Sequence, residues 1–123
     1  MKLYKATRRF PKEEVYGLTS QIRRSAVSVP SNISDGYGRK TTPDYLKSLF
    51  IAYGSSCELE TQLLISNDLG YIKDGEIKEL KEEMGEVERM LKALIKSLKN
   101  PFRPGGFAEA KNPRILDPFL MFA

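Results

Sequence analysis

The chain has 123 residues, of which 41% are hydrophobic and 29% are charged, a composition typical of one globular domain. The absence of histidine excludes the commonest general base, the Ser-His and Cys-His nucleophile pairs, and metal sites that rely on imidazole. The net charge is +4, and the single cysteine, Cys57, excludes an internal disulfide and fits a reducing cytoplasm.

The first half of the chain predicts one short and one long helix. Residues 2–9 allow about two helical turns before Phe10-Pro11 interrupts them. Apolar residues then recur at spacings of three and four, which predicts a helix over residues 14–38. Because Pro30 falls inside this pattern and clashes with the carbonyl of Ala26, we expect a kink there rather than two separate helices.

A second long helix is predicted over residues 43–69. Thr42 as N-cap and Pro43 in the first turn mark its start, and Gly70 marks its end. Its apolar residues form a stripe so wide that we expect cover on more than one side. The main stripe consists of Leu46, Leu49, Phe50, Tyr53, Cys57, Leu63 and Leu64, with Leu59 and Ile65 outside it. We therefore interpret Cys57 as a core residue and not as a nucleophile.

The last predicted helix runs from Asp74 to Lys99, and its apolar positions alternate in steps of three and four without a break. These positions are Ile77, Leu80, Met84, Val87, Leu91, Leu94 and Leu98. Residues 101–123 are rich in proline and glycine and follow no helical period. The sequence thus predicts an all-α fold. The three long helices, joined by short loops, predict an up-down antiparallel bundle over residues 1–100 whose fourth wall is left open, followed by an irregular C-terminal extension over residues 101–123.

Charge is distributed unevenly along the chain. Residues 1–40 carry nine basic and three acidic residues, whereas residues 41–100 carry eight and eleven. This gradient favours a polyanion or an acidic protein surface as partner, and it fits equally well helices of opposite charge that attract each other within one bundle. For an RNA partner we expect phosphate contacts without base readout. The candidate residues are Lys2, Lys5, Arg8, Arg9, Arg39 and Lys40.

Two glutamates in the middle of the second long helix, Glu58 and Glu60, are the candidates for acid–base chemistry. Residues two apart on a helix point in different directions, so the two carboxylates do not form a dyad. We interpret them as structural, and expect one of them to pair across the bundle with Arg23 or Arg24, because buried charges need partners. We predict no catalytic residue, cofactor or metal site.

Two parts of the chain carry a family resemblance. The run FPKEEVYGLTSQIRRSAVSVPSNISDGYGR over residues 10–39, with SSCELETQL over 55–63 and DLGYI over 68–72, resembles the four-helix-bundle proteins encoded in bacterial 23S ribosomal-RNA intervening sequences. The likeness spans roughly residues 8–99, and its motifs occur in order at plausible separations. The motifs include the four structural polar residues Arg23, Arg24, Glu58 and Glu60.

The resemblance implies a four-helix bundle that assembles into a ring-like homo-oligomer, typically a pentamer. A related branch serves as the accessory protein of diversity-generating retroelements, where a basic pentamer engages a reverse transcriptase and RNA. Family members begin with a full-length first helix, whereas only residues 1–9 precede the Phe-Pro turn here. The apolar tail around residues 115–122, or an element of another chain, is therefore expected to fill part of the groove that this leaves.

The sequence thus favours a non-enzymatic, homo-oligomeric bundle that associates with RNA or a nucleoprotein. The alternative is a protein-interaction adaptor that presents its acidic last helix to a basic partner and binds no nucleic acid. The acidic residues of that helix are Glu76, Glu79, Glu82, Glu83, Glu86 and Glu88. We expect a cytoplasmic protein that uses neither a membrane nor a small-molecule substrate, because no apolar run reaches membrane-spanning length and the N-terminus is too polar for a signal peptide.

Overall fold

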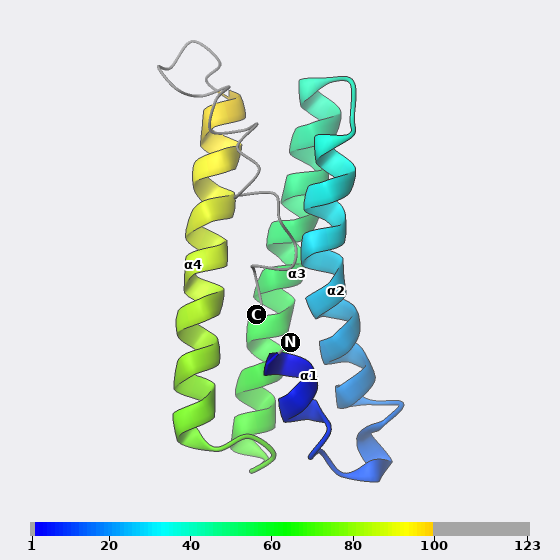
Figure 1. The fold of residues 1–123 in the computed structure, drawn as a ribbon, viewed down its shortest axis with the longest axis vertical. Coiled ribbons are helices and arrows are strands. Elements are labelled where there is room, and N and C mark those ends of the chain that lie inside the picture. The colour runs from blue at the N-terminus through cyan, green and yellow to red at the C-terminus, as the bar shows by residue number, and fades with distance from the viewer. Residues whose placement is uncertain (1, 100–123) are drawn as a thin grey trace.

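The computed structural model describes residues 2–99, and every regular element in this range is a helix (Figure 1). The elements are α1 (Lys2–Thr7), the 3-10 helix η1 (Lys12–Glu14), α2 (Leu18–Tyr37), α3 (Thr42–Asp68) and α4 (Asp74–Lys99). The three long helices lie side by side and alternate in direction, and the short α1 lies at one end of them. The predicted all-α, antiparallel four-helix architecture with a short first helix is confirmed. The extension over residues 101–123, including the tail around residues 115–122, lies outside the described residues.

The last helix, α4, begins and ends at the predicted residues, Asp74 and Lys99. All seven apolar positions of its predicted seam are buried. Its connection to α3 is fixed by Gly70, whose positive φ of 79° is favourable only for glycine. There the amide of Tyr71 donates to the carbonyl of Ser66 and the amide of Gly70 to that of Asn67, which is the hydrogen-bond pattern of a Schellman ending. This turn reverses the chain and places α4 antiparallel to α3.

Beside their buried apolar residues, α2 and α3 share polar contacts that recur every seven residues along both helices. Asp35 accepts a hydrogen bond from Ser48 at 3.2 Å, Ser28 and Ser55 share one at 2.8 Å, and Gln62 donates to Gln21 at 3.5 Å. In each pair the two residue numbers add to the same total, as expected for two antiparallel helices in one register. We call these three contacts the polar ladder.

Small residues allow α2 and α3 to come close along this ladder. Gly36 is buried, and a Cβ atom placed on it would lie 2.9 Å from the Cβ of Ser48. Real Cβ atoms essentially never approach so closely, so this position requires glycine while the two helices keep their spacing. α2 continues through Pro30 as one helix, as predicted, and Pro30 is buried in it; the kink there stays a prediction.

The buried stripe of α3 differs from the predicted one. Cys57 is exposed, as are Phe50 and Leu64, so the interpretation of Cys57 as a core residue is wrong. Leu59, predicted to lie off the stripe, is fully buried. The side of α3 that faces the other helices also contains small residues such as Ser56, which hydrophobicity does not mark in the sequence. Because α3 has apolar residues on two faces, hydrophobicity alone could not identify the inner one.

The start of α2 also differs from the prediction. The helix begins at Leu18, about one turn later than expected, and the preceding residues form η1 and a turn. Val15 belongs to the apolar spacing but is 49% exposed, and Tyr16 is 97% exposed. The amide of Gly17 donates to the carbonyl of Glu14 and closes the turn before the helix starts. The helical period therefore extends one turn beyond the helix itself.

We expect Gly36→Ala to lower the free energy of unfolding by about 1–3 kcal/mol, because the added methyl forces α2 and α3 apart. Gly85→Ala in α4 is the matched control, since its new methyl meets only the flexible guanidinium end of Arg89. This control should be neutral or stabilise the protein by up to about 1 kcal/mol. Urea denaturation followed by circular dichroism measures both. Equal effects of the two substitutions would contradict close packing at Gly36.

Candidate nucleic-acid interface

The six basic residues predicted to contact phosphate lie at opposite ends of the bundle. Lys2 and Lys5 belong to α1, and Arg8 and Arg9 directly follow it. Arg39 and Lys40 lie in the connection between α2 and α3, at the other end of the long helices (Figure 1). A helix of the length of α2 spans about 30 Å, so the six residues do not form one continuous surface.

Three of these six residues form ion pairs within the chain. Lys2 pairs with Glu83, Arg9 with Glu76, and Arg39 with Asp35. The hydrogen bond and charge of Glu83 raise the pKa of Lys2, and the hydrogen bond from Arg39 lowers the pKa of Asp35. The first two pairs join the basic N-terminal segment to the acidic first half of α4. They match the alternative interpretation of the charge gradient, in which segments of opposite charge attract each other within the bundle.

A second group of cations converges on one pocket where α1 meets the start of α2. The pocket has a volume of about 460 Å³, and we call it the basic pocket. Its lining consists of Thr7, Arg8, Phe10, Pro11, Lys12, Val15, Thr19, Ser20 and Arg23. No lining residue is acidic, and none of the three ion pairs found among residues 2–99 uses its cations.

The polar groups of the basic pocket are suited to an anion. The guanidinium of Arg23 lies over the ring of Tyr4 at 4.9 Å and donates from Nε to the hydroxyl of Thr7 at 3.0 Å, which fixes its position. The hydroxyl of Thr19 is buried and has no hydrogen-bond partner among the residues that the structure describes. Thr19 and Ser20 lie in the first turn of α2, which Gly17 leaves without a side-chain cap. Free amides at a helix N-terminus attract anions.

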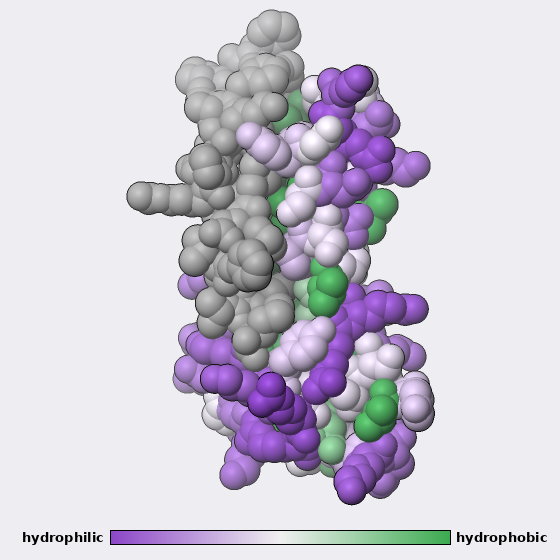
Figure 2. All heavy atoms as spheres, turned by 45° about the vertical axis from the view of Figure 1, so that its right-hand side comes forward, coloured by the Kyte–Doolittle hydropathy of each residue, from purple (hydrophilic) through white to green (hydrophobic). Residues whose placement is uncertain are grey.

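One carboxylate lies close to this arrangement. The side chain of Glu14 approaches Gly17, with Oε1 3.4 Å from the position of a Cβ on that glycine. It does not line the basic pocket, but its charge opposes an anion at the start of α2. The end of the molecule that carries α1 and the start of α2 is largely hydrophilic on the face shown in Figure 2, with a few apolar residues between the polar ones.

The pocket combines predicted residues with residues that the sequence did not indicate. Arg8 was predicted as a phosphate contact and Arg23 only as a structural residue, whereas Lys12 and Thr19 were not predicted at all. The pocket forms because residues 8–15 fold back against α2, a contact that no local pattern encodes. One signal was present: Lys12 and Arg23 both belong to the family run over residues 10–39. Lys5 and Lys40 are exposed, and their phosphate contacts stay a prediction.

The structural polar residues have other partners than the expected ones. The ion pairs within the described range do not join Glu58 or Glu60 to either arginine. Glu58 accepts a hydrogen bond from Gln62 at 3.2 Å, and Arg24 is exposed. Glu60 instead lies near Glu88 of α4. Burial raises the pKa of Glu88, and the neighbouring Glu60 raises it further, against the opposing effects of Lys92 and Ser56.

Comparison with known proteins identifies a family. The model of the 23S rRNA-intervening sequence protein family matches residues 1–93, which is three quarters of the chain and includes the basic pocket. No curated protein sequence matches the chain. Within residues 2–99, no three Cys, Asp or Glu side chains are grouped closely enough to hold a metal ion. None of the described helices combines the length and apolar character needed to cross a membrane.

We expect Glu88→Gln to stabilise the protein at about pH 7 and to reduce the pH dependence of its stability. The folded state raises the pKa of Glu88 above its ordinary value of 4.5, so the folded state holds this proton more tightly than the unfolded chain. This contribution to stability is complete below the ordinary pKa and is lost as the pH rises through the folded-state pKa. Glu86→Gln, at an exposed site of the same helix, is the control. Thermal melts from about pH 4 to pH 8 test this, and identical profiles of the two variants would contradict it.

Proposed function

This chain belongs to the 23S rRNA-intervening sequence protein family, and from that premise we propose that it is a non-enzymatic, homo-oligomeric helical-bundle protein that binds RNA through the basic pocket. The observation that carries the proposal is the convergence of Arg8, Lys12 and Arg23 on one pocket without an acidic partner. The buried hydroxyl of Thr19 and an uncapped helix N-terminus lie in the same place. We expect this binding to take place in the cytoplasm.

Phosphate groups are the part of RNA that such a pocket suits. Arginine and lysine neutralise phosphates and release their counterions, which gives affinity without reading the sequence. The guanidinium of Arg23 is already oriented by Thr7, so little freedom is lost when it contacts an anion. Lys2, Arg9 and Arg39 would each have to exchange a carboxylate for a phosphate, and their contribution to binding is correspondingly smaller.

The same ion pairs weaken the case for an adaptor that presents an acidic helix. Glu76 and Glu83 already have basic partners within the chain, and these partners lie over the first half of α4. A basic protein partner that binds these two glutamates would have to displace those partners. RNA binding at an unpaired basic surface needs no such displacement, and we therefore place it first.

Self-association is supported by an apolar surface on α3. Ile51, Leu64, Ile65 and Leu69 are between 40% and 55% exposed, and we call these four residues the α3 outer surface. Leu64, Ile65 and Leu69 lie within two turns of each other, with Ile51 earlier in α3, and clustered exposed apolar side chains mark interaction sites in proteins. A helix with apolar residues on all sides is normally covered on all sides, and α2 and α4 cover only the inner ones. A second copy of the chain is the occupant we propose, and the ring-like pentamer stays a prediction.

The RNA proposal predicts that Arg8→Gln combined with Lys12→Gln weakens RNA binding and its salt dependence. The logarithmic salt slope should fall by about 0.7 for each lost phosphate contact on single-stranded RNA. The control is Lys78→Gln with Lys81→Gln, which removes the same charge from exposed sites of α4. Glu14→Gln should have the opposite effect and strengthen binding. Fluorescence polarisation with labelled RNA measures all three, and equal losses in the two double variants would overturn the assignment to the basic pocket.

The self-association proposal predicts that Leu64→Glu with Ile65→Glu shifts the protein toward single chains of 14.0 kDa. Both side chains are already partly exposed, so the folded monomer should tolerate the change. Val15→Glu is the control, because Val15 is equally apolar and exposed but lies in the turn before α2. Size-exclusion chromatography with light scattering gives the masses. A wild-type protein that is monomeric at high concentration would contradict the proposal.

A further inference from the structure

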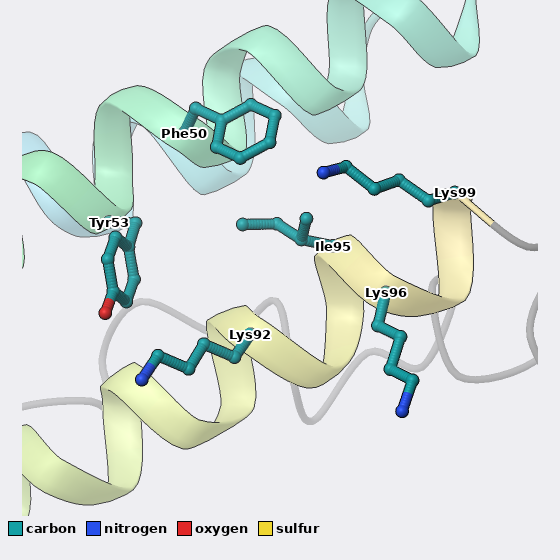
Figure 3. A pocket seen from close by; sticks show the side chains of 6 residues that line it. All are labelled: Phe50, Tyr53, Lys92, Ile95, Lys96 and Lys99. Carbon is teal, nitrogen blue, oxygen red and sulfur yellow. The ribbon is translucent and has the colours of Figure 1, made fainter.

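A second pocket lies between α3 and the last turns of α4, away from the basic pocket. Its volume is about 430 Å³, which is within the range of ligand-binding pockets. We call it the lysine groove, and its lining consists of Phe50, Tyr53, Lys92, Ile95, Lys96 and Lys99. Figure 3 shows the two aromatic side chains descending from α3, Ile95 between the helices, and the three lysines along α4.

The lysine groove combines an apolar floor with three lysines, and the carboxylate of Glu88 interacts with the first of them, Lys92. The Nζ atom of Lys99 lies 5.0 Å from the centre of the Phe50 ring, and that of Lys92 lies 5.6 Å from the centre of the Tyr53 ring. Lys96 points away from both rings (Figure 3). None of these lysines takes part in the ion pairs formed within residues 2–99, unlike Lys2, Arg9 and Arg39. A ligand that matches this arrangement has flat, apolar faces and more than one negative charge.

The spacing of the charges points to a chain of anionic groups. Lys92, Lys96 and Lys99 follow each other at intervals of four and three residues, so they extend over about 10 Å of one helix face. A single carboxylate or headgroup reaches only one part of such a row, whereas consecutive phosphates of a nucleic-acid strand reach all of it. The aromatic rings lie directly beside the row and offer faces on which bases can stack.

We propose that the lysine groove binds single-stranded RNA, with bases stacked on Phe50 and Tyr53 and phosphates contacted by Lys92, Lys96 and Lys99. This inference rests on the proposed RNA-binding function and adds the class of RNA that is bound. Bases in a duplex are already stacked on each other and expose only their edges, so the rings select a single strand. On binding, the two lysines over the rings turn to the phosphates, because a stacked base stabilises more than an exposed cation over a ring does.

The chain contains no tryptophan, so Tyr53→Trp introduces a unique fluorescent reporter into the groove of the full-length protein. We expect a single-stranded oligouridylate of roughly eight nucleotides to quench its emission. Inorganic polyphosphate, which has charge but no bases, should not quench it. Quenching by an RNA duplex of the same length to the same extent would overturn the proposal. A response to decanoate without a response to RNA would also overturn it, in favour of an acyl-chain site.

Two further variants test the groove without relying on the reporter. Phe50→Leu keeps an apolar side chain but removes the stacking face, and it should weaken binding of the single strand about five-fold or more in fluorescence polarisation. Polyphosphate binding should not change in this variant. Lys96→Gln should weaken the binding of both the single strand and polyphosphate. Lys78→Gln, at an exposed site on the other half of α4, is its control.

The results separate the groove from the broader function. In one outcome, RNA binds without changing the emission of the Tyr53→Trp variant, and Phe50→Leu does not weaken the binding. This result would overturn the proposal for the lysine groove and leave the basic pocket as the RNA site. The absence of any RNA binding by the wild-type protein at low salt overturns both proposals. Quenching that persists when Arg8→Gln and Lys12→Gln are added to the reporter variant shows that the groove binds RNA by itself.

Discussion

The polar ladder between α2 and α3 is the contact on which the rest of the bundle depends. Its pairs, such as Ser28 with Ser55, fix the register of two long helices, and Gly36 lets the backbones approach beside it. Hydrogen bonds at seven-residue intervals oppose a slip by a single residue, because such a slip would break all three of them at once. With α2 and α3 fixed, α4 packs on the next face of α3, and the third face of α3 remains outside the bundle.

Much of this architecture could be predicted from the sequence, and the success varied with the kind of signal. The helix from Asp74 to Lys99 was predicted to the residue, because its apolar seam is narrow and regular. The inner face of α3 was not predicted correctly. Hydrophobicity marks the large residues, whereas closely packed helices need small ones. Cys57, predicted in the core, is therefore exposed, and Leu59, predicted outside the main stripe, is buried.

The candidate site was predictable only in part, because it depends on contacts between distant segments. Charge counting identified Arg8, but it also selected Lys2 and Arg9, whose partners Glu83 and Glu76 lie 81 and 67 positions further along the chain. Pairings at such separations follow from the fold and not from local composition. The same limitation applies to the lysine groove, whose aromatic rings and lysines come from two different helices. Residue types indicate which chemistry is possible, and the packing of helices decides which groups meet.

The short first helix has a consequence for how ligand binding and folding are linked. α1 is only six residues long. It is held by the buried side chains of Leu3, Ala6 and Thr7, by the contacts of Tyr4 and Thr7 with Arg23, and by an ion pair of Lys2, and a further ion pair of Arg9 follows it. A segment with so few contacts opens more easily than the long helices, and the basic pocket opens with it because Thr7 and Arg8 form one wall. An anion in the pocket therefore stabilises the docked segment by mass action, as any ligand stabilises the state that binds it. Salt screens the two ion pairs and competes with an anion for the pocket, so under the proposed RNA-binding function the attachment of the N-terminal segment and the affinity for RNA should fall together as ionic strength rises.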